Sequence, residues 1–338
     1  MPQLLSVQIL RAAAAFAVVI CHVGITLNYW GKADLQWPLV GAAGVDLFFV
    51  ISGFIMVALS WDSFAQAGEP IKFFVRRLVR IVPLYWLLTT IYVVGGKYDI
   101  WRAVGSYLFV WTGEQQPVVG VGWSLNFEMF FYVIFAACMM MPRAVALVSL
   151  SAALIAVTLV RLPFYSDPIV LEFLFGVFVA IAYRRGVRLI PIARVLLVMV
   201  GVAAIIYWSD SVHDGFRWGV PAALIVAGAV LGSPIERRTP IVMALVAVGD
   251  ASYALYLIHV PIVRVIADVM RSAGLDLVRI QPIYFVIATA AAIGAALLVY
   301  RFVELPLLAL LKSRTSQRRP AAAEIGVAAA LNSSHTPS

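Results

Sequence analysis

The sequence predicts an all-α membrane protein: a polytopic bundle of about ten transmembrane helices with both termini in the cytoplasm. Composition is the first reason, because 63% of the 338 residues are hydrophobic and only 12% are charged, whereas soluble domains are about half apolar and a quarter charged. Run length is the second, because a helix needs roughly 20 apolar residues to cross a bilayer core. The third is the placement of Lys and Arg, which concentrate in alternate loops.

Ten apolar stretches are the candidate spans. A further run at 101–113 has only about 13 residues, which suits a re-entrant or surface helix better than a crossing. In chain order the ten stretches are 7–28, 41–60, 81–95, 124–141, 144–161, 168–183, 189–208, 217–232, 248–266 and 282–303.

Basic residues set the orientation of these spans. With the N-terminus inside and ten crossings, the inner loops collect most of the Lys and Arg residues, including the cluster at 72–80 and the pairs at 184–185 and 237–238. This asymmetry has the sign of the positive-inside rule. An eleventh crossing at 101–113 would place the last basic cluster on the outer side, so the sequence favours ten spans.

Only one change of composition divides the chain. Residues 1–311 are predicted to form the transmembrane domain, and residues 312–338 a cytoplasmic tail that is basic and then disordered, because small and polar residues dominate its end. His335 in that tail and His213 in a polar loop are expected to be solvated bystanders.

Several other classes of protein do not fit the sequence. Cys21 and Cys138 both lie in apolar runs, which argues against a disulfide framework. The net charge of +8 is not gathered into a basic stripe on a soluble domain, so nucleic-acid binding is not expected. No spacing of His, Cys and Asp suggests a metal site. The first apolar run is followed by further spans rather than by a cleavage pattern, so it is not interpreted as a removable signal peptide.

The first span carries an arginine and a histidine on one face. Arg11 and His22 are eleven residues apart, which is three helical turns plus about 20°, so both side chains point the same way, roughly 16 Å apart along the axis. His22 then lies near the outer leaflet and Arg11 near the inner one. The alternative is an arginine that reaches the membrane interface and a histidine satisfied by a neighbouring helix.

Three further ionisable residues are predicted at a depth similar to that of His22. Asp46 begins the second span, Glu128 lies about one turn into the span that starts near 124, and His259 lies close to the outer end of a late span. Ionisable groups within a membrane normally face the bundle interior and pair there. We therefore expect a shared polar chamber near the outer surface, with Tyr132 on the same helical face as Glu128.

The cytoplasmic side has a basic cluster of its own at the entry to the third span. Lys72, Arg76, Arg77 and Arg80 follow one another within "IKFFVRRLVR", and the arginines lie three and four residues apart, so they can share a helical face. Guanidinium groups bind phosphate oxygens bidentately, which indicates a phosphate-bearing ligand. The alternatives are the positive-inside rule alone or contact with anionic lipid headgroups.

Taken together, these stretches resemble the integral-membrane acyltransferase-3 family, over about residues 1 to 310. The resemblance lies in "LRAAAAFAVVICH", "DLFFVISGF", "RLVR", "WSLNFEMFFY", "SYALYLIHVP" and "VELP", which occur in that order. Within them the matching residues are Arg11 and His22; Phe48, Phe49, Ser52 and Gly53; Arg77 and Arg80; Trp123, Glu128 and Tyr132; and Val303 to Pro306. In length and opening, the chain is most similar to the bacterial exopolysaccharide acetyltransferases of the family.

The resemblance implies a membrane-embedded O-acyltransferase of the bacterial inner membrane. Such a protein transfers an acetyl or similar acyl group from cytoplasmic acyl-CoA, a co-substrate, to a sugar hydroxyl of an exopolysaccharide, another surface glycan or a lipid-linked oligosaccharide precursor. No metal, nucleic acid or particular oligomeric state is implied. The residues implied are His22 and Glu128 for catalysis; Arg11, Arg76, Arg77 and Arg80 for the donor; and Asp46, Ser52, Trp123, Tyr132 and His259 for substrate binding or support.

For the chemistry, His22 is expected to act as general base and Glu128 to orient or stabilise the imidazolium, as a carboxylate does in hydrolytic triads. A variant makes His22 a transient acyl carrier. His259 could equally be structural, and Asp46 is expected to position or pack.

Two other function classes stay open. A transporter or flippase of lipid-linked saccharide could use the buried polar residues as a proton relay, although the halves show no convincing inverted repeat of the kind common in transport folds. A membrane scaffold without catalysis would leave the alignment of Arg11 with His22 unexplained.

Overall fold

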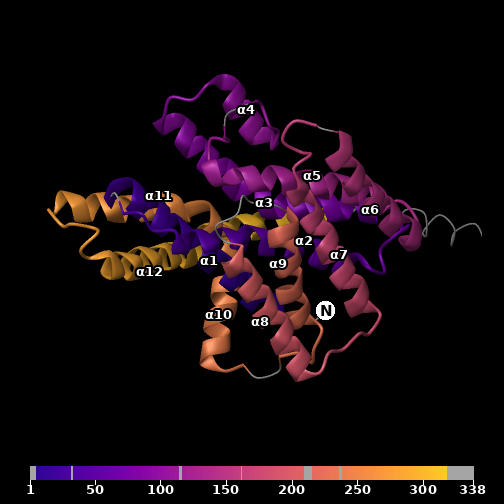
Figure 1. Cartoon of the computed structure of the whole chain (residues 1–338). Coiled ribbons are helices and arrows are strands. Elements are labelled where there is room, and N and C mark those ends of the chain that lie inside the picture. Colours follow the sequence, from indigo (N-terminus) through magenta and orange to yellow (C-terminus); the bar gives the residue numbers. More distant parts are fainter. Residues whose placement is uncertain are drawn as a thin grey trace, which may run out of the picture.

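The structure is a computed structural model that describes residues 5–31, 33–113, 116–160, 162–208, 215–235 and 238–317 (Figure 1). His213, His335 and the tail beyond Gln317 lie outside the described residues, so the predictions made for them stay predictions. Every regular element within the described residues is helical, which confirms the all-α class.

Within the described residues, 3-10 or π turns join several of the helices. Three of the helices contain an internal proline: α3, α9 and α11. The main helices are α1 Leu5–Gly31, α2 Ala43–Ser60, α3 Glu69–Gly95, α4 Ile100–Leu108, α5 Trp123–Cys138, α6 Arg143–Val160, α7 Leu171–Arg184, α8 Pro191–Tyr207, α9 Gly215–Val230, α10 Pro240–Asp250, α11 Ser252–Ser272, α12 Gln281–Val299 and α13 Leu305–Gln317.

Seven helical segments in the described part of the chain are long and apolar enough to cross a membrane. Three shorter apolar helices, α8, α9 and α10, add to them. The count of ten crossings and the cytoplasmic termini stay predictions. The seven segments are Leu5–Gly31, Trp37–Ser60, Glu69–Gly95, Gly120–Cys138, Arg143–Val160, Ser252–Ser272 and Gln281–Leu311.

Some predicted boundaries were wrong. The third span was expected at 81–95, but α3 already begins at Glu69, because its basic first turns continue the helix beyond the apolar stretch. The span expected at 248–266 is divided by a break at Ala251 into the end of α10 and the start of α11. The run at 101–113 forms only α4, a helix of nine residues. Beyond 282–303 the helix continues through a π turn, Tyr300–Glu304, into α13.

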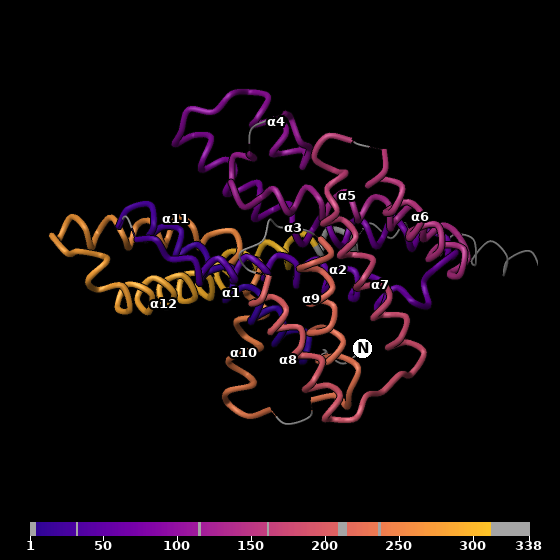
Figure 2. Tube along the Cα trace, in the orientation of Figure 1, coloured from indigo at the N-terminus to yellow at the C-terminus, as the bar shows by residue number. Residues whose placement is uncertain are grey.

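Helix α1 occupies the middle of the bundle. It packs against α2, α10, α11 and α12, and the tube view in Figure 2 shows it between the α11–α12 pair and the group formed by α8, α9 and α10. Its small and branched residues Ala14, Val18 and Val19 are buried at these contacts, as a helix enclosed on most sides requires. The helix that carries Arg11 and His22 is therefore central to the fold.

Helices α2 and α7 approach each other closely because glycines lie at their crossing. A Cβ atom at Gly53 would overlap the carbonyl oxygen of Phe173, and one at Gly176 would overlap that of Val50. Small residues allow this kind of close helix contact in membranes. Gly53, which lies in the motif "DLFFVISGF", is thus a packing element of the α2–α7 crossing.

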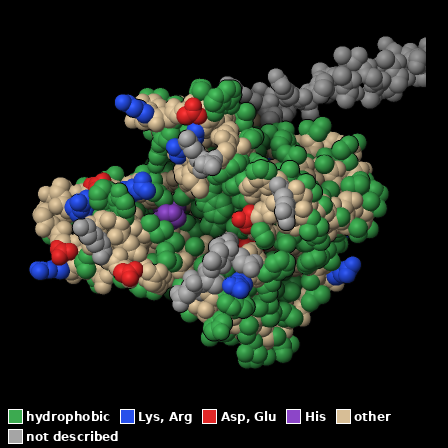
Figure 3. Space-filling view, turned by 45° about the horizontal axis from the view of Figure 1, so that its top comes forward, with side chains coloured by type: hydrophobic (Ala, Val, Ile, Leu, Met, Phe, Trp, Pro, Cys, Tyr) green, Lys and Arg blue, Asp and Glu red, His purple; other side chains and the backbone are tan. Residues whose placement is uncertain are grey.

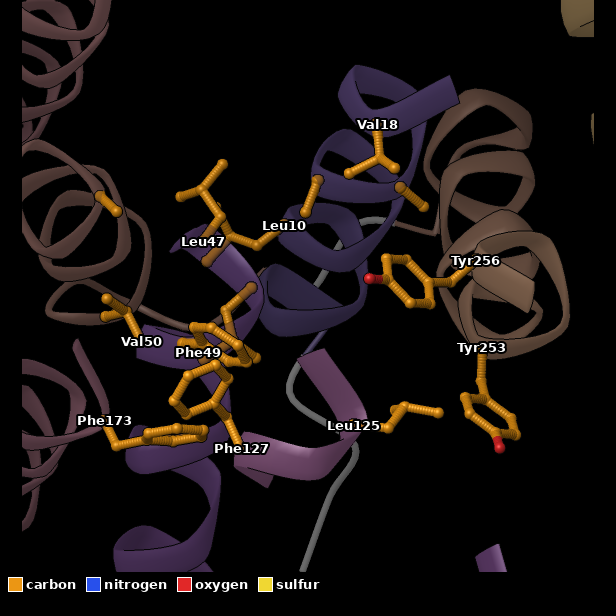
Figure 4. Packing of buried hydrophobic residues seen from close by; sticks show 14 of the residues in the cluster. Leu10, Val18, Leu47, Phe49, Val50, Leu125, Phe127, Phe173, Tyr253 and Tyr256 are labelled. Carbon is orange, nitrogen blue, oxygen red and sulfur yellow. The ribbon is translucent and has the colours of Figure 1, made fainter. Parts of the chain in front are cut away.

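Aromatic rings fill the space beside this crossing. Figure 4 shows Phe49 of α2, Phe127 of α5 and Phe173 of α7 gathered together, with ring centroids of Phe49 and Phe173 4.8 Å apart and those of Phe49 and Phe127 6.2 Å apart. Such offset or edge-to-face pairs add to the energy of simple burial. They fix α2 and α5 in the positions from which Ser52 and Glu128 face a common cavity.

Candidate active site

A cavity of about 110 Å³ lies among α1, α2, α3, α5 and α11. One side of its wall is apolar and is formed by Val45, Phe48 and Ile55 of α2. The rest of the wall carries many polar side chains, which is unusual for the interior of an apolar bundle. Polar groups converging in an apolar pocket are the usual form of a small-molecule site. The polar lining residues are Arg11, Ser52, Arg77, Arg80, Ser124, Glu128, Tyr132, Ser252, Tyr253 and Tyr256.

Three guanidinium groups form the basic wall of this cavity, contributed by Arg11, Arg77 and Arg80. The Nη1 atom of Arg11 donates to Gln8 Oε1 at 3.3 Å. Arg77 lies over the ring of Phe73, 5.6 Å from its centroid, and its Nε atom has no hydrogen-bond partner among the described residues. An N–H group left without a partner on a half-buried guanidinium can donate a hydrogen bond to an anionic ligand.

Arg80 is balanced by a carboxylate that the sequence analysis did not single out. Its Nη1 atom lies 3.6 Å from Oε1 of Glu304, a buried residue at the end of the π turn. Glu304 is the acidic residue of the "VELP" motif, so the motif was visible in the sequence, but its partner was not.

Arg76 does not belong to the basic wall. Its side chain is 56% exposed and lies 3.9 Å from Glu69, on the outside of α3, and the cavity lining does not include it. The expectation that it joins Arg77 and Arg80 was wrong, because consecutive residues are rotated by about 100° around a helix and cannot share one narrow face.

Glu128 faces the cavity, and two hydroxyl groups hold it there. Ser52 Oγ donates to Glu128 Oε1 at 2.9 Å, and the hydroxyl of Tyr132 donates to the same oxygen. The predicted contact between Glu128 and Tyr132 is present. The expected pairing of Glu128 with His22 is not, since the hydrogen bonds of the carboxylate go to Ser52 and Tyr132.

Two tyrosines of α11 close the side of the cavity opposite α2. Tyr256 OH donates to Val121 O at 2.9 Å and lies 2.6 Å from Ser124 Oγ, and Tyr253 OH donates to Ile81 O at 2.6 Å. Figure 4 shows both rings projecting from the same helix. These tyrosines were not proposed as site residues, although the motif "SYALYLIH" contains both.

The predicted polar chamber contains only the two histidines. His22 Nδ1 and His259 Nε2 are 3.2 Å apart, and the ring centroids are 4.7 Å apart in an edge-on arrangement with an interplanar angle of 76°. Neither histidine lines the cavity, but the ring of His259 contacts that of Tyr256, which does. The pair therefore lies one side chain beyond the cavity.

His22 is the accessible member of the pair. His259 is fully buried, whereas His22 is partly exposed. Figure 3 shows a histidine side chain at the wall of a hollow on one face of the molecule. A ligand that approaches from solvent or from the membrane surface can thus reach His22 without displacing His259.

Asp46 lies outside both groups, contrary to the shared chamber expected for it. Its side chain is fully buried and interacts with Glu172, another fully buried carboxyl group at the start of α7. Sequence reasoning missed Glu172, because it lies in the first turn of a helix, where an acidic residue is ordinary. Asp46 thus serves the α2–α7 contact, in line with the positioning role considered for it.

The side chain of Trp123 does not line the cavity and packs against aromatic rings beside it. As the first residue of α5, it packs edge-on against Phe49 and Phe127, and the adjacent Ser124 faces the cavity instead. Among the described residues, no group of three or more His, Cys, Asp and Glu side chains is placed to hold a metal ion.

Comparison with known proteins identifies the family of the chain. The acyltransferase domain family matches residues 4–301. The exopolysaccharide production protein ExoZ of Rhizobium meliloti is 32% identical, over 80% of this chain and 90% of its own length. The acyltransferase MdmB of Streptomyces mycarofaciens is 26% identical, over 75% and 78%.

A more distant relative is the peptidoglycan O-acetyltransferase OatA of Listeria monocytogenes, which is 22% identical over 89% of this chain. The match covers only 55% of that relative's own length. No solved structure matches the chain. The family match extends over nearly the whole helical domain and includes the cavity and the histidine pair. The chain is therefore a multi-pass membrane protein that belongs to the acyltransferase-3 family, and it is an acyltransferase.

Proposed function

We propose that this enzyme transfers an acetyl or similar acyl group from acyl-CoA to a hydroxyl of an exopolysaccharide, another surface glycan or its lipid-linked precursor, at the bacterial inner membrane. The similarity to an exopolysaccharide production protein over 80% of the chain supports the acceptor class. The observation that carries the proposal is the cavity, which has guanidinium groups in its wall and the histidine pair one side chain away.

The basic wall suits the donor. Coenzyme A is polyanionic at its nucleotide end and carries the thioester on a long, largely apolar arm. Arg77 and Arg80 would bind phosphate oxygens bidentately, with Arg11 further along the arm. The apolar residues of α2 that line the cavity would contact the arm.

His22 would act as the general base. As the acceptor oxygen attacks the thioester carbonyl, its proton passes to the imidazole, a new C–O bond forms and the C–S bond breaks. The imidazolium then returns the proton to the leaving thiolate. The partial exposure of His22 supports this role, because the hydroxyl of a glycan must reach the ring.

Mass spectrometry of surface polysaccharide tests the proposal. Polysaccharide from cells that express the chain should carry acetyl groups, whereas cells without it, or with His22→Ala in its place, should lack them. Immunoblotting of membranes must show that the variant inserts normally. Equal acetylation in all three strains would refute the acceptor and the base together, and saccharide uptake by liposomes that contain no acyl donor would support a transporter instead.

A further inference from the structure

The two histidines differ in what each ring nitrogen contacts, and this difference has a chemical consequence. We infer that His259 is a positioning residue that fixes the tautomer of His22 and leaves Nε2 of His22 unprotonated to receive the acceptor proton. The inference rests on the proposed function, in which His22 is the base. It assigns to a second histidine the role that the sequence analysis gave to Glu128.

The proton of His259 can be located from its neighbours. His259 Nδ1 lies 3.0 Å from Leu255 O, and a carbonyl oxygen can only accept a hydrogen bond. Nδ1 of His259 must therefore carry the proton. In a neutral imidazole the other nitrogen is then an acceptor, so Nε2 of His259 presents a lone pair.

The same reasoning applies to His22. Its Nδ1 atom lies 3.0 Å from Val18 O and 3.2 Å from His259 Nε2. Both neighbours are acceptors, so Nδ1 of His22 is the donor to both. The remaining nitrogen, Nε2, is left without a proton, which is the state that a general base requires.

Each of the two contacts has a different effect on His22. The bond to Val18 O belongs to the same helix and joins residues four apart, so it ties the ring to its own backbone. The bond to His259 comes from α11 and fixes the direction in which the ring faces. The second contact therefore makes the orientation of the base depend on the packing of α11 against α1.

His259 is itself held firmly. It is fully buried, its ring contacts Tyr256, and Tyr256 is fixed by Ser124 and Val121 O. A neutral imidazole in this position supplies an acceptor for the His22 N–H without placing a negative charge in an apolar interior, where an isolated carboxylate would be expensive. As His22 takes up the acceptor proton, its Nδ1–H bond to His259 is retained and strengthened, because a charged donor binds an acceptor more tightly.

Three substitutions at position 259 separate this role from simple packing. In His259→Gln the amide group reaches the place of Nε2 and can still accept from His22. In His259→Asn it occupies the place of Nδ1 and can only satisfy Leu255 O. His259→Leu does neither.

We expect His259→Leu and His259→Asn to lower kcat for acyl transfer on the order of 10²-fold. The KM for the donor should be nearly unchanged in both. His259→Gln should retain clearly more activity than His259→Asn. A purely structural histidine would give the opposite order, with His259→Asn the better variant, or equal losses in both. Either result would overturn the inference. His335→Gln, a substitution in the tail, is the control for removing a histidine, and size-exclusion chromatography in detergent shows whether each variant folds.

Nitrogen-15 NMR of histidine-labelled protein in lipid nanodiscs reports the tautomer without any activity. The chain has four histidines, and the single substitutions assign their signals. Wild-type protein should show His22 with Nδ1 protonated, and His259→Leu should show loss of the single tautomer. A wild-type His22 protonated at Nε2 would refute the inference. Absence of acyl transfer by a wild-type protein with the expected tautomer would instead refute the proposed function.

Discussion

Arg80 of α3 and Glu304 at the end of the π turn form an ion pair, with 3.6 Å between Nη1 and Oε1. The pair joins the motifs "RLVR" and "VELP", which lie more than 200 residues apart in the chain. Arg11, another cation of the cavity wall, is influenced electrostatically by Glu128 and, to a lesser extent, by Glu304. π turns in helices occur frequently at functional sites, and here the turn ends in the residue that anchors the basic wall.

We expect Glu304→Gln to destabilise the protein by about 1–3 kcal/mol. Breaking a fully buried pair costs roughly 3–5 kcal/mol, and the 31% exposure of Arg80 reduces that cost through solvent screening. Thermal unfolding in detergent measures the change. Lys72→Gln is the matched control, because the side chain of Lys72 is 63% exposed, so its ion pair with Glu69 should contribute less than about 1 kcal/mol. Equal losses in the two variants would contradict the anchoring role.

Arg77→Gln should raise the KM for acyl-CoA by about 10- to 100-fold, because a charge-assisted hydrogen bond contributes roughly 1.5–3 kcal/mol. Arg76→Gln, one residue earlier, should change the KM by less than about threefold, since its side chain is exposed and pairs with Glu69. Steady-state kinetics at two salt concentrations tests both variants. A comparable rise in the two would place the donor outside the cavity.

Glu128→Gln should retain kcat within about tenfold of the wild type. If Glu128 oriented His22, its neutral isostere would cost on the order of 10⁴-fold, as in a hydrolytic triad. In the structure the carboxylate instead accepts from Ser52 and Tyr132, and an amide oxygen can accept from the same hydroxyls.

Glu128→Ala is the companion variant. It leaves the buried hydroxyl of Tyr132 and the half-buried hydroxyl of Ser52 without their acceptor and should destabilise the protein by about 2 kcal/mol. Single-turnover acyl transfer and thermal unfolding, measured on both variants, distinguish the two effects. A loss in Glu128→Gln as large as that in His22→Ala would restore the carboxylate to the catalytic pair.

Local helical geometry predicted one contact within a single helix, but it misplaced Arg76, which lies outside the cavity that Arg77 and Arg80 line. The contact between Glu128 and Tyr132, four residues apart, follows from the helical repeat. The membrane class and the family followed from composition and motif order. Partners on different helices could not be obtained in this way.

The partner of His22 shows why. Depth in the membrane can be counted along the sequence, but the rotation of each helix about its axis is set by tertiary packing. Glu128 and His259 are both near His22 in predicted depth, and only the packing of α11 against α1 selects His259. The partner of Glu304 could not be predicted for the same reason, since Arg80 lies far away in the chain.

The α2–α7 crossing gives a prediction about stability. Gly176→Ala should destabilise the protein by about 1–3 kcal/mol, because the new methyl group would overlap the backbone of α2 at Val50. Gly294→Ala in α12 is the matched control: it is also helical, but a Cβ there meets nothing within 4 Å, so it should be neutral or slightly stabilising. Thermal unfolding of both variants decides the matter, and a neutral Gly176→Ala would show that the helices separate readily.

Cysteine labelling tests the orientation on which the donor route depends. Lys72 and Lys97 lie near the two ends of α3, and both are exposed. The variants Lys72→Cys and Lys97→Cys therefore report on opposite sides of the membrane. Each is made in a background in which Cys21 and Cys138 are replaced by Ala. The excess of basic residues near Lys72 predicts that this position faces the cytoplasm. A membrane-impermeant maleimide applied to intact spheroplasts should therefore label Lys97→Cys, and should label Lys72→Cys only after the membrane is opened. The reverse pattern would place the end of α3 that carries Lys72 on the side of the membrane where acyl-CoA is absent, and it would contradict acyl-CoA as the donor.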